Sequence, residues 1–132
     1  NRHEAVYTDF QKELLSDLEE CVQIARNAGI PDDRIILDPG IGFGKTYEMN
    51  LEALHHLEDL HRLGFPILLG TSRKSVIGLT LDLPADQRLE GTLATSVIGV
   101  MKGCAFIRVH DIKENYRAIR MTEAILGRTA HG

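Results

Sequence analysis

Three polar segments of the sequence could bind a ligand, and each of them follows an apolar run. The first is Asp38 with the loop after it, which has glycines at positions 40, 42 and 44. The second is Gly-Thr-Ser-Arg-Lys-Ser at residues 70–75, and the third is Arg-Val-His-Asp at residues 108–111. Apolar runs without polar alternation predict buried strands, and α/β folds place their ligand sites at the carboxyl ends of such strands. We therefore expect the three segments to meet at one rim of a sheet.

Asp38 is the candidate for binding a planar heterocycle. At the end of a strand and facing a glycine loop, its carboxylate could accept two N–H donors from an amidine-like ring edge. Glycines permit the backbone conformations and close approaches that such a loop needs. Phe43 could form a wall of the same site. The alternatives are that Asp38 caps the turn that follows it and that Phe43 packs under the loop.

Residues 70–75 are a candidate for binding an anion. Two cations, Arg73 and Lys74, lie among three hydroxyl side chains. If a helix begins at Ser75, its free N–H groups would also attract a carboxylate or a phosphate. The alternative is a solvated basic turn in which Ser72 is the N-cap of a helix.

Arg108 and His110 are a second candidate for anion binding. Arg108 lies inside an apolar run, where an unpaired charge is costly, so it needs a partner or a ligand. His110 follows two residues later, and alternation along a strand would point both side chains the same way. A lone histidine is more often structural, but this pair favours an anion clamp.

Familiar nucleotide and metal motifs are incomplete in this sequence. Gly44-Lys45-Thr46 has the ending of a phosphate-binding loop, but that pattern requires glycine where Pro39 stands. The dinucleotide fingerprint fails because its third glycine falls at position 44 instead of 45. His55, His56 and His61 are expected on a solvated helix face beside acidic residues, and the common zinc spacings are missing. We predict no metal ligands in this chain.

Composition predicts a globular α/β chain with small-molecule partners. The 132 residues carry a net charge of -4 with dispersed Lys and Arg, which argues against a nucleic-acid surface. No apolar run approaches the length of a membrane span, so no membrane partner is expected. Cys21 and Cys104 are interpreted as reduced, mostly buried thiols, which favours the cytoplasm. Because the chain opens at Asn1, we expect it to be part of something longer.

Apolar periodicity predicts helices that alternate with strands. A capping box at Thr8-Asp9-Phe10-Gln11 predicts a first helix of about 20 residues, and Asp111-Ile112-Lys113-Glu114 predicts the start of the last helix. Other helices are expected at 51–63, 75–79 and 87–102, and strands at 35–38, 67–69 and 104–109. One helix followed by three strand–helix units implies parallel strands, in part of a closed barrel or of a doubly wound sheet.

Three ordered motifs in this sequence resemble the dihydropteroate synthases of the folate pathway. They are residues 36–45, 69–75 and 107–111, and the Arg-Leu-Glu-Gly-Thr segment at 88–92 is also similar. The resemblance covers nearly the whole chain. It implies that residues 1–132 form the C-terminal part of a pterin-binding (β/α)8 TIM barrel, with its sixth, seventh and eighth strands. Asn1-Arg2 would then follow the fifth strand.

The resemblance also implies a reaction. Members of the family are transferases that condense 6-hydroxymethyl-7,8-dihydropterin pyrophosphate with 4-aminobenzoate, giving 7,8-dihydropteroate and pyrophosphate. Mg²⁺ usually assists the leaving group, and its ligands are expected outside this portion of the barrel. The family is cytoplasmic and a sulfonamide target, and the helices late in its barrel form a homodimer.

By resemblance, Lys74, Arg108 and His110 would be the catalytic residues. Lys74 would bind a ring heteroatom of the pterin, Arg108 would stack on the ring and meet the anion, and His110 would help to hold pyrophosphate. Asp38 would bind the guanidine-like ring edge, and Ser75 would receive the aminobenzoate carboxylate. The full set of implied substrate-binding residues is Asp38, Phe43, Gly70, Ser72, Arg73, Lys74, Ser75, Arg108 and His110.

The first five strands of the family barrel have no counterpart in this sequence. Those strands supply further pterin-binding residues and mobile loops, so the chain alone is expected to have negligible synthase activity. Two other functions stay open. One is a methyltetrahydrofolate-type pterin-binding methyltransferase domain, which would share Asp38 but not need the anion site at 72–75. The other is a non-catalytic half-barrel whose exposed helices serve association.

Overall fold

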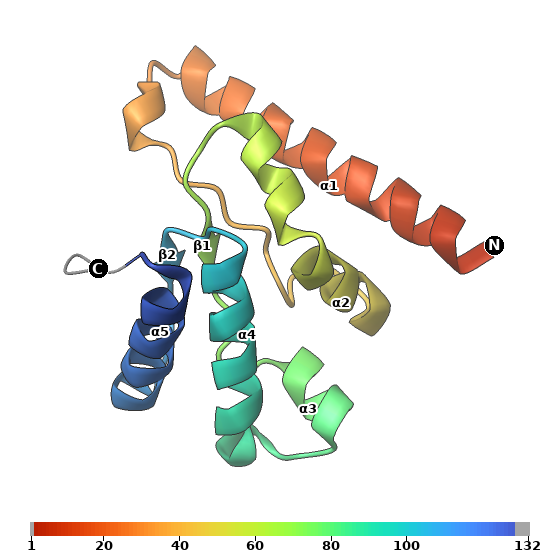
Figure 1. The fold of residues 1–132 in the computed structure, drawn as a ribbon. Coiled ribbons are helices and arrows are strands. Elements are labelled where there is room, and N and C mark those ends of the chain that lie inside the picture. The colour runs from red at the N-terminus through yellow and green to blue at the C-terminus, as the bar shows by residue number, and fades with distance from the viewer. Residues whose placement is uncertain (1, 129–132) are drawn as a thin grey trace.

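The computed structural model describes residues 2–128, with side chains from residue 9 onwards. Its helices are α1 (Arg2–Asn27), α2 (Tyr47–His55), α3 (Ser75–Leu81), α4 (Leu89–Met101) and α5 (Ile112–Leu126). Its strands are β1 (Leu68–Leu69) and β2 (Phe106–Ile107), and short 3-10 helices are η1 (Asp32–Arg34), η2 (Leu57–Leu63) and η3 (Ala85–Gln87). Figure 1 shows α1 lying along α2 at one end of the molecule and α5 beside α4 at the other. The predicted α/β class is confirmed.

The sheet is parallel, and β1 is its central strand. Leu68 and Leu69 of β1 pair with Phe106 and Ile107 of β2. On the other side, Leu37 forms a parallel bridge with Ile67, the residue before β1. The three segments that were predicted as strands therefore lie side by side in the order first, second, third, as successive β/α units require.

In the described part of the chain, helices cover one face of this sheet and leave the other open. Ile35, Leu37, Ile67 and Leu69 alternate along their strands toward the buried face, where they belong to the two apolar core clusters. Residues at the alternate strand positions point the other way: Ile36 is 48% exposed, and Phe106 of β2 is 47% exposed. By the same alternation, Asp38 and Arg108 lie on this second, uncovered face.

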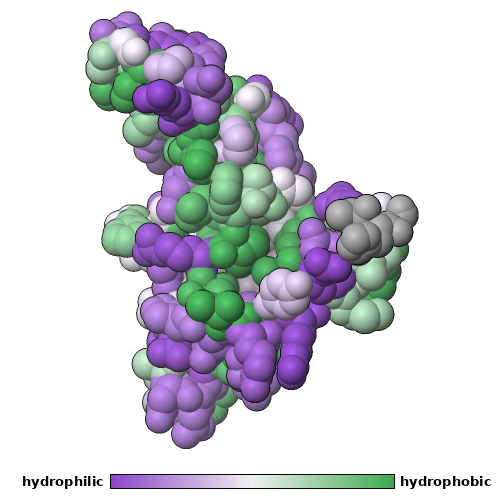
Figure 2. All heavy atoms as spheres, turned by 90° about the vertical axis from the view of Figure 1, so that its left-hand side faces the viewer, coloured by the Kyte–Doolittle hydropathy of each residue, from purple (hydrophilic) through white to green (hydrophobic). Residues whose placement is uncertain are grey.

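The core lies between the covered face of the sheet and the helices. The buried stripe of α1 contributes Phe10, Leu14 and Leu18, and η2 contributes Leu57 and Leu60. Helix α3 adds Val76 and Ile77 to the same cluster. Figure 2 shows apolar residues gathered across the middle of one face of the molecule, with polar residues above and below them.

The strand lengths, the start of α1 and the capping of α5 differ from the sequence prediction. Strands 35–38 and 104–109 were predicted too long, because only Leu37 and residues 106–107 have ladder partners in the described part of the chain. Helix α1 begins at Arg2, so the predicted capping box at Thr8 is wrong: the helix runs through it. Asp111 is the N-cap of α5, but its side chain makes no capping hydrogen bond.

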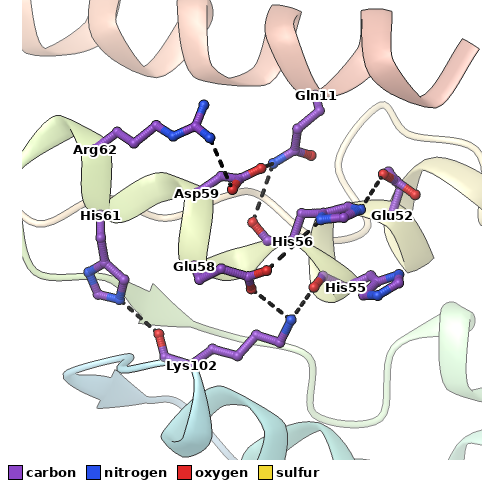
Figure 3. Close-up of polar contacts among 9 residues, drawn as sticks. All are labelled: Gln11, Glu52, His55, His56, Glu58, Asp59, His61, Arg62 and Lys102. Carbon is purple, nitrogen blue, oxygen red and sulfur yellow. Dashed lines mark hydrogen bonds and ion pairs between the residues drawn. The ribbon is translucent and has the colours of Figure 1, made fainter. Parts of the chain in front are cut away.

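A polar network joins α1, the α2–η2 junction and α4 (Figure 3). From α4's C-cap, Lys102 donates to Glu58 Oε2 at 2.7 Å and to the carbonyl of His55, and its own carbonyl contacts His61 Nε2 at 2.7 Å. From α1, buried Gln11 reaches the carbonyl of His56 at 3.4 Å. His55 and His61 are exposed, as predicted, but the network also gives this histidine segment a role in packing.

None of the described helices combines the length and the apolar character needed to cross a membrane. Cys21 is exposed on α1, which corrects the prediction that both thiols are buried. Cys104 is partly buried, and burial raises the pKa of its thiol to about 11.

Candidate functional site at the ends of the strands

The glycine loop after Asp38 is held by three polar side chains. Asp38 Oδ1 accepts a hydrogen bond from the Gly40 N–H at 2.8 Å, so the carboxylate does cap the following turn while it stays exposed. Lys45 Nζ donates to the Gly40 carbonyl at 2.9 Å. Asn50, from α2, accepts from the Gly42 N–H at 2.9 Å. The glycines at 40, 42 and 44 all have positive φ, which explains why the loop is built from glycine.

Lys74 connects the glycine loop with the loop after β1. Its ammonium group donates to the Ile41 carbonyl and lies 4.7 Å from the centre of the Phe43 ring. A Cβ at Gly42 would lie 3.3 Å from Lys74 Cδ, so the glycine gives the lysine stem room to pass. Burial lowers the pKa of Lys74; the Asp38 carboxylate opposes this, and the positive charges of Arg108 and Lys45 lower it further.

A cleft of about 280 Å³ lies beside Lys74 at the ends of β1 and β2. It is lined by Gly70, Ser72, Lys74, Arg108, Val109 and His110. Arg108 was predicted inside a buried strand, but it follows β2 and is exposed, so its charge needs no buried partner. Five of the nine predicted substrate-binding residues, including all three predicted catalytic ones, therefore share one cleft.

Ser72 fixes the orientation of the His110 ring. Ser72 Oγ accepts from the backbone N–H of His110 at 3.2 Å and lies 2.7 Å from His110 Nδ1. The hydroxyl can donate to Nδ1 or accept from it, depending on the tautomer of the ring, and in the tautomer where it donates the ring proton lies on Nε2. The alternative in which Ser72 is the N-cap of a helix is wrong: Lys74 is the N-cap of α3.

Arg73, Ser75, Asp38 and Phe43 do not line this cleft. The Arg73 guanidinium forms an ion pair with Asp111 at 3.0 Å. Ser75 is the exposed first residue of α3. Asp38 and Phe43 each interact with Lys74, which does line the cleft: Asp38 through its charge and Phe43 through its ring. Their contacts with substrate stay predictions.

Several residues that shape the site were given no role from the sequence. Asn50 is 3% exposed, and Thr92, from α4, is fully buried and accepts a hydrogen bond from the Arg73 N–H at 3.1 Å. Arg88 donates to the Arg73 carbonyl at 2.9 Å. A polar residue within an apolar helix stripe is the only local signal that could have drawn attention to Asn50 or Thr92.

Two other features of the described residues resemble ligand sites. A larger cavity of about 440 Å³ lies between α2, α3 and α4, but its lining is almost entirely apolar and lies away from the strand ends. Glu52, His55 and His56 bring possible metal-ligand atoms within 4.8 Å of one another. The two imidazole rings are stacked at 4.5 Å, however, so their in-plane nitrogens do not point at a common centre.

Comparison with known proteins identifies the family of this chain. The sequence profile of a family described as "Pterin binding enzyme" matches residues 1–110. This chain belongs to the pterin binding enzyme family. Among curated family relatives, the dihydropteroate synthase of Clostridium beijerinckii is 59% identical over 129 residues, which is 97% of this chain and 48% of that protein.

Solved structures of pterin binding enzymes have the same fold. A dihydropteroate synthase from Coxiella burnetii in complex with pteroic acid superposes with a TM-score of 0.88 at 36% identity, covering 93% of this chain and 46% of that one. The Yersinia pestis dihydropteroate synthase with a sulfonamide drug has a TM-score of 0.78 at 42% identity, covering 91% of this chain and 42% of that one. The chain spans about half the length of the curated relatives it matches.

Proposed function

We propose that this chain provides part of the active site of a dihydropteroate synthase, and that its three strands are the sixth, seventh and eighth of a (β/α)8 barrel. Helices cover one face of the sheet, and Ile36 and Phe106 are exposed on the other. In a barrel that second face would be the packed interior, whereas a doubly wound sheet has helices on both faces. The one-sided covering therefore supports the barrel.

The observation that carries the function is the shared cleft of Ser72, Lys74, Arg108 and His110, with Asp38 on the same face of the sheet. In the proposed reaction, the amine nitrogen of 4-aminobenzoate forms a bond with the exocyclic methylene carbon of the pterin. The bond from that carbon to oxygen breaks, pyrophosphate leaves with the electron pair, and the amine loses a proton. Groups that stabilise the departing anion contribute most to such a step.

The cations of the cleft suit the departing pyrophosphate. Lys74 and Arg108 supply positive charge, and His110 would donate from Nε2 in the tautomer whose Nδ1 accepts from the Ser72 hydroxyl. Asp38 would bind the guanidine-like edge of the pterin through its exposed carboxylate. Lys74 would also bind a ring heteroatom, and Arg108 would stack on the ring.

The second substrate, 4-aminobenzoate, is proposed to bind beside this cleft, where sulfonamides would compete with it. Phe43 is exposed on the glycine loop, Gly70 lines the cleft, and Ser75 begins α3 next to Lys74. Ser72 and Arg73 complete the proposed substrate-binding set, Ser72 from inside the cleft and Arg73 from its edge. We also propose that the intact enzyme is a cytoplasmic homodimer.

The residues that line the cleft do not fit Mg²⁺ by themselves. Magnesium prefers an octahedral set of carboxylate, phosphate and water oxygens, whereas these side chains are a hydroxyl, two cations and an imidazole. Any Mg²⁺ that assists the leaving group would take its protein ligands from strands beyond these three. No step of the reaction is therefore assigned to a metal held by this chain.

Binding measurements on variants test the proposed function. Asp38→Asn should weaken the binding of pteroic acid at least about tenfold, or about 1.4 kcal/mol, because an amide cannot replace a carboxylate that accepts two N–H donors. Asp33→Asn, which changes an exposed aspartate of η1, is the matched control. Equal affinities for the two variants in isothermal titration would contradict the role of Asp38.

The methyltransferase alternative is separated by the second substrate. Titration of the chain with 4-aminobenzoate in the presence of pyrophosphate should release heat if the synthase proposal is right, and Lys74→Met should remove this response while Lys12→Met, on exposed α1 surface, should not. A methyltransferase domain predicts no aminobenzoate binding. Turnover by this chain alone should be negligible, because several cooperating groups are missing.

A further inference from the structure

Arg73 has an unusual backbone conformation. Its φ is +60°, in the left-handed region that residues with a Cβ rarely adopt. Among the described residues, the only other non-glycine with positive φ is Asp82, which is the C-cap of α3. A strained residue of this kind persists only where its surroundings hold it in place. Arg73 lies between Ser72 and Lys74, two residues that line the cleft.

Both backbone polar groups of Arg73 are held by residues from the start of α4. Its N–H donates to Thr92 Oγ1 at 3.1 Å, and its carbonyl accepts from Arg88 Nη1 at 2.9 Å. Arg88 Nε also donates to the Leu83 carbonyl at 3.0 Å, so one guanidinium joins two loops. The side chain of Arg73 is tied separately, to Asp111 before α5.

The Arg88 guanidinium lies in a slot made by a glycine. A Cβ on Gly78 of α3 would come within 2.2 Å of Arg88 Nη2 and 2.3 Å of Cζ, well below any van der Waals contact. Gly78 is buried and does not have positive φ, so backbone freedom does not explain it. Its role is to let Arg88 lie flat against α3 and reach Arg73.

The neighbours of Arg73 depend on this conformation. Ser72 Oγ reaches His110, and Lys74 Nζ reaches the Ile41 carbonyl, on different sides of the loop. A change of φ at Arg73 to the extended region would rotate Lys74 relative to Ser72, so the two side chains could not keep both contacts. The left-handed turn therefore sets the shape of the cleft.

We propose that Arg88 is a positioning residue that holds Arg73 in its left-handed conformation and thereby keeps Ser72 and Lys74 in the cleft. Thr92 assists by holding the Arg73 N–H. The inference rests on the proposed function only in that the cleft is taken to bind pyrophosphate. Arg88 itself does not line the cleft.

The conformational part is tested without any ligand. In the full chain, backbone chemical shifts and scalar couplings of residue 73 should report positive φ, and in Arg88→Met they should move toward the extended region. Arg117→Met, which changes an exposed arginine of α5, should leave them unchanged. A left-handed residue 73 in Arg88→Met would overturn the proposal. If that variant does not fold, Arg88→Lys serves instead, because one ammonium group cannot span both carbonyls.

The functional part uses inorganic pyrophosphate as the probe. Arg88→Met should weaken pyrophosphate binding about tenfold. Added to Arg88→Met, Arg73→Gly and Arg73→Ala both remove the Arg73 side chain, so the two double variants differ only in backbone preference. The variant with glycine should bind pyrophosphate more tightly than the one with alanine, since glycine adopts positive φ without being held. Equal effects of the two additions would overturn the proposal. A wild-type chain that binds no pyrophosphate would contradict the proposed function, and the spectra of residue 73 would still decide the role of Arg88.

Discussion

Asn50 is a single side chain on which the shape of the glycine loop depends. It is 3% exposed and accepts from the Gly42 N–H at 2.9 Å. Asn50→Ala should lower the free energy of unfolding by about 1–3 kcal/mol in urea denaturation, because that N–H loses its partner. Hydrogen exchange of the Gly42 amide should also speed up. Asn50→Leu fills the same space without an acceptor, so recovery of stability in that variant would contradict the importance of the hydrogen bond.

The two cysteines should react at different rates. Cys21 is exposed, whereas burial raises the pKa of Cys104 to about 11 from its ordinary 9.0. Because the thiolate is the reactive form, iodoacetamide at pH 8 should alkylate Cys21 at least about tenfold faster than Cys104, as measured by mass spectrometry. Raising the pH toward 11 should narrow the gap. Denaturant should remove it, and equal rates in the folded chain would refute the burial of Cys104.

The same shift predicts the sign of a pH effect on stability. Between about pH 9 and 11 the unfolded chain releases the Cys104 proton while the folded chain retains it. Ionisation of Cys104 therefore makes no difference to the free energy of unfolding below about pH 9, and it lowers that free energy as the pH rises through this window.

At this scale the sequence predicted residues whose chemistry is local. Lys74, Arg108 and His110 could be found because they belong to polar segments at the ends of apolar runs, and the structure brings all three into one cleft. Asn50 could not be assigned a role, because no sequence pattern shows that the loop folds back to bring the Gly42 N–H to its side chain. Arg88 was noticed through the family resemblance, but its contact with Arg73 depends on how α3 packs against α4.

The packing of α3 on α4 depends on a glycine, Gly91, which has no side chain to hold the helices apart. A Cβ on Gly91 of α4 would lie 2.3 Å from Ile77 Cγ2, so the helices approach more closely than any larger residue allows. Gly91→Ala should lower the free energy of unfolding by about 1–3 kcal/mol, because the helices must move apart or Ile77 must leave its rotamer. Chemical denaturation would measure this loss.

A double-mutant cycle identifies the cause of that loss. Ile77→Ala removes the atom that the new methyl group meets, so Gly91→Ala should cost clearly less in its presence. Additive losses would show that the close contact between Gly91 and Ile77 is not what limits the helix packing.

Helix ends were predictable where glycine sets them, and strand lengths were not. Gly64 ends η2 with a φ of +83°, and Gly103 follows α4 with a φ of +85°, as the pattern of glycine after apolar stripes indicated. The predicted helix 51–63 is instead divided at His56, whose φ of -112° interrupts it between α2 and η2. A strand needs a pairing partner as well as apolar residues. The apolar run 104–109 therefore looks like a longer strand in the sequence, although it pairs with β1 at only two positions.

At the scale of the molecule, the uncovered sheet face links fold and function. The face that carries Ile36 and Phe106 also carries Asp38 and Arg108, so the apolar floor and the binding residues belong to one surface. In a closed barrel, the floor would be packed by the remaining strands while the polar rim stayed open to substrate. The chain spans about half the length of the curated relatives it matches, so the remaining strands of the proposed barrel would lie in the part of the protein beyond this sequence.

An uncovered apolar sheet face should make the isolated chain self-associate. Strands with unpaired edges and exposed side chains such as Ile36 and Phe106 favour contact with another copy. In sedimentation velocity at micromolar concentration, we expect species larger than a monomer whose share rises with concentration. Ile36→Thr with Phe106→Thr should lower the association constant at least about tenfold, since each buried apolar side chain contributes about 1.5–3 kcal/mol.

A matched substitution on α5 distinguishes association through the sheet face from association through the outer helices. Ile125 is 73% exposed on α5, and Ile125→Thr should leave association through the sheet face unchanged. The reverse pattern, with Ile125→Thr dispersing the chain and the strand variant still associating, would assign association to the outer helices and support the association alternative. A chain that sediments as a monomer at every concentration would contradict both, and would mean that the uncovered face tolerates water without the rest of the barrel.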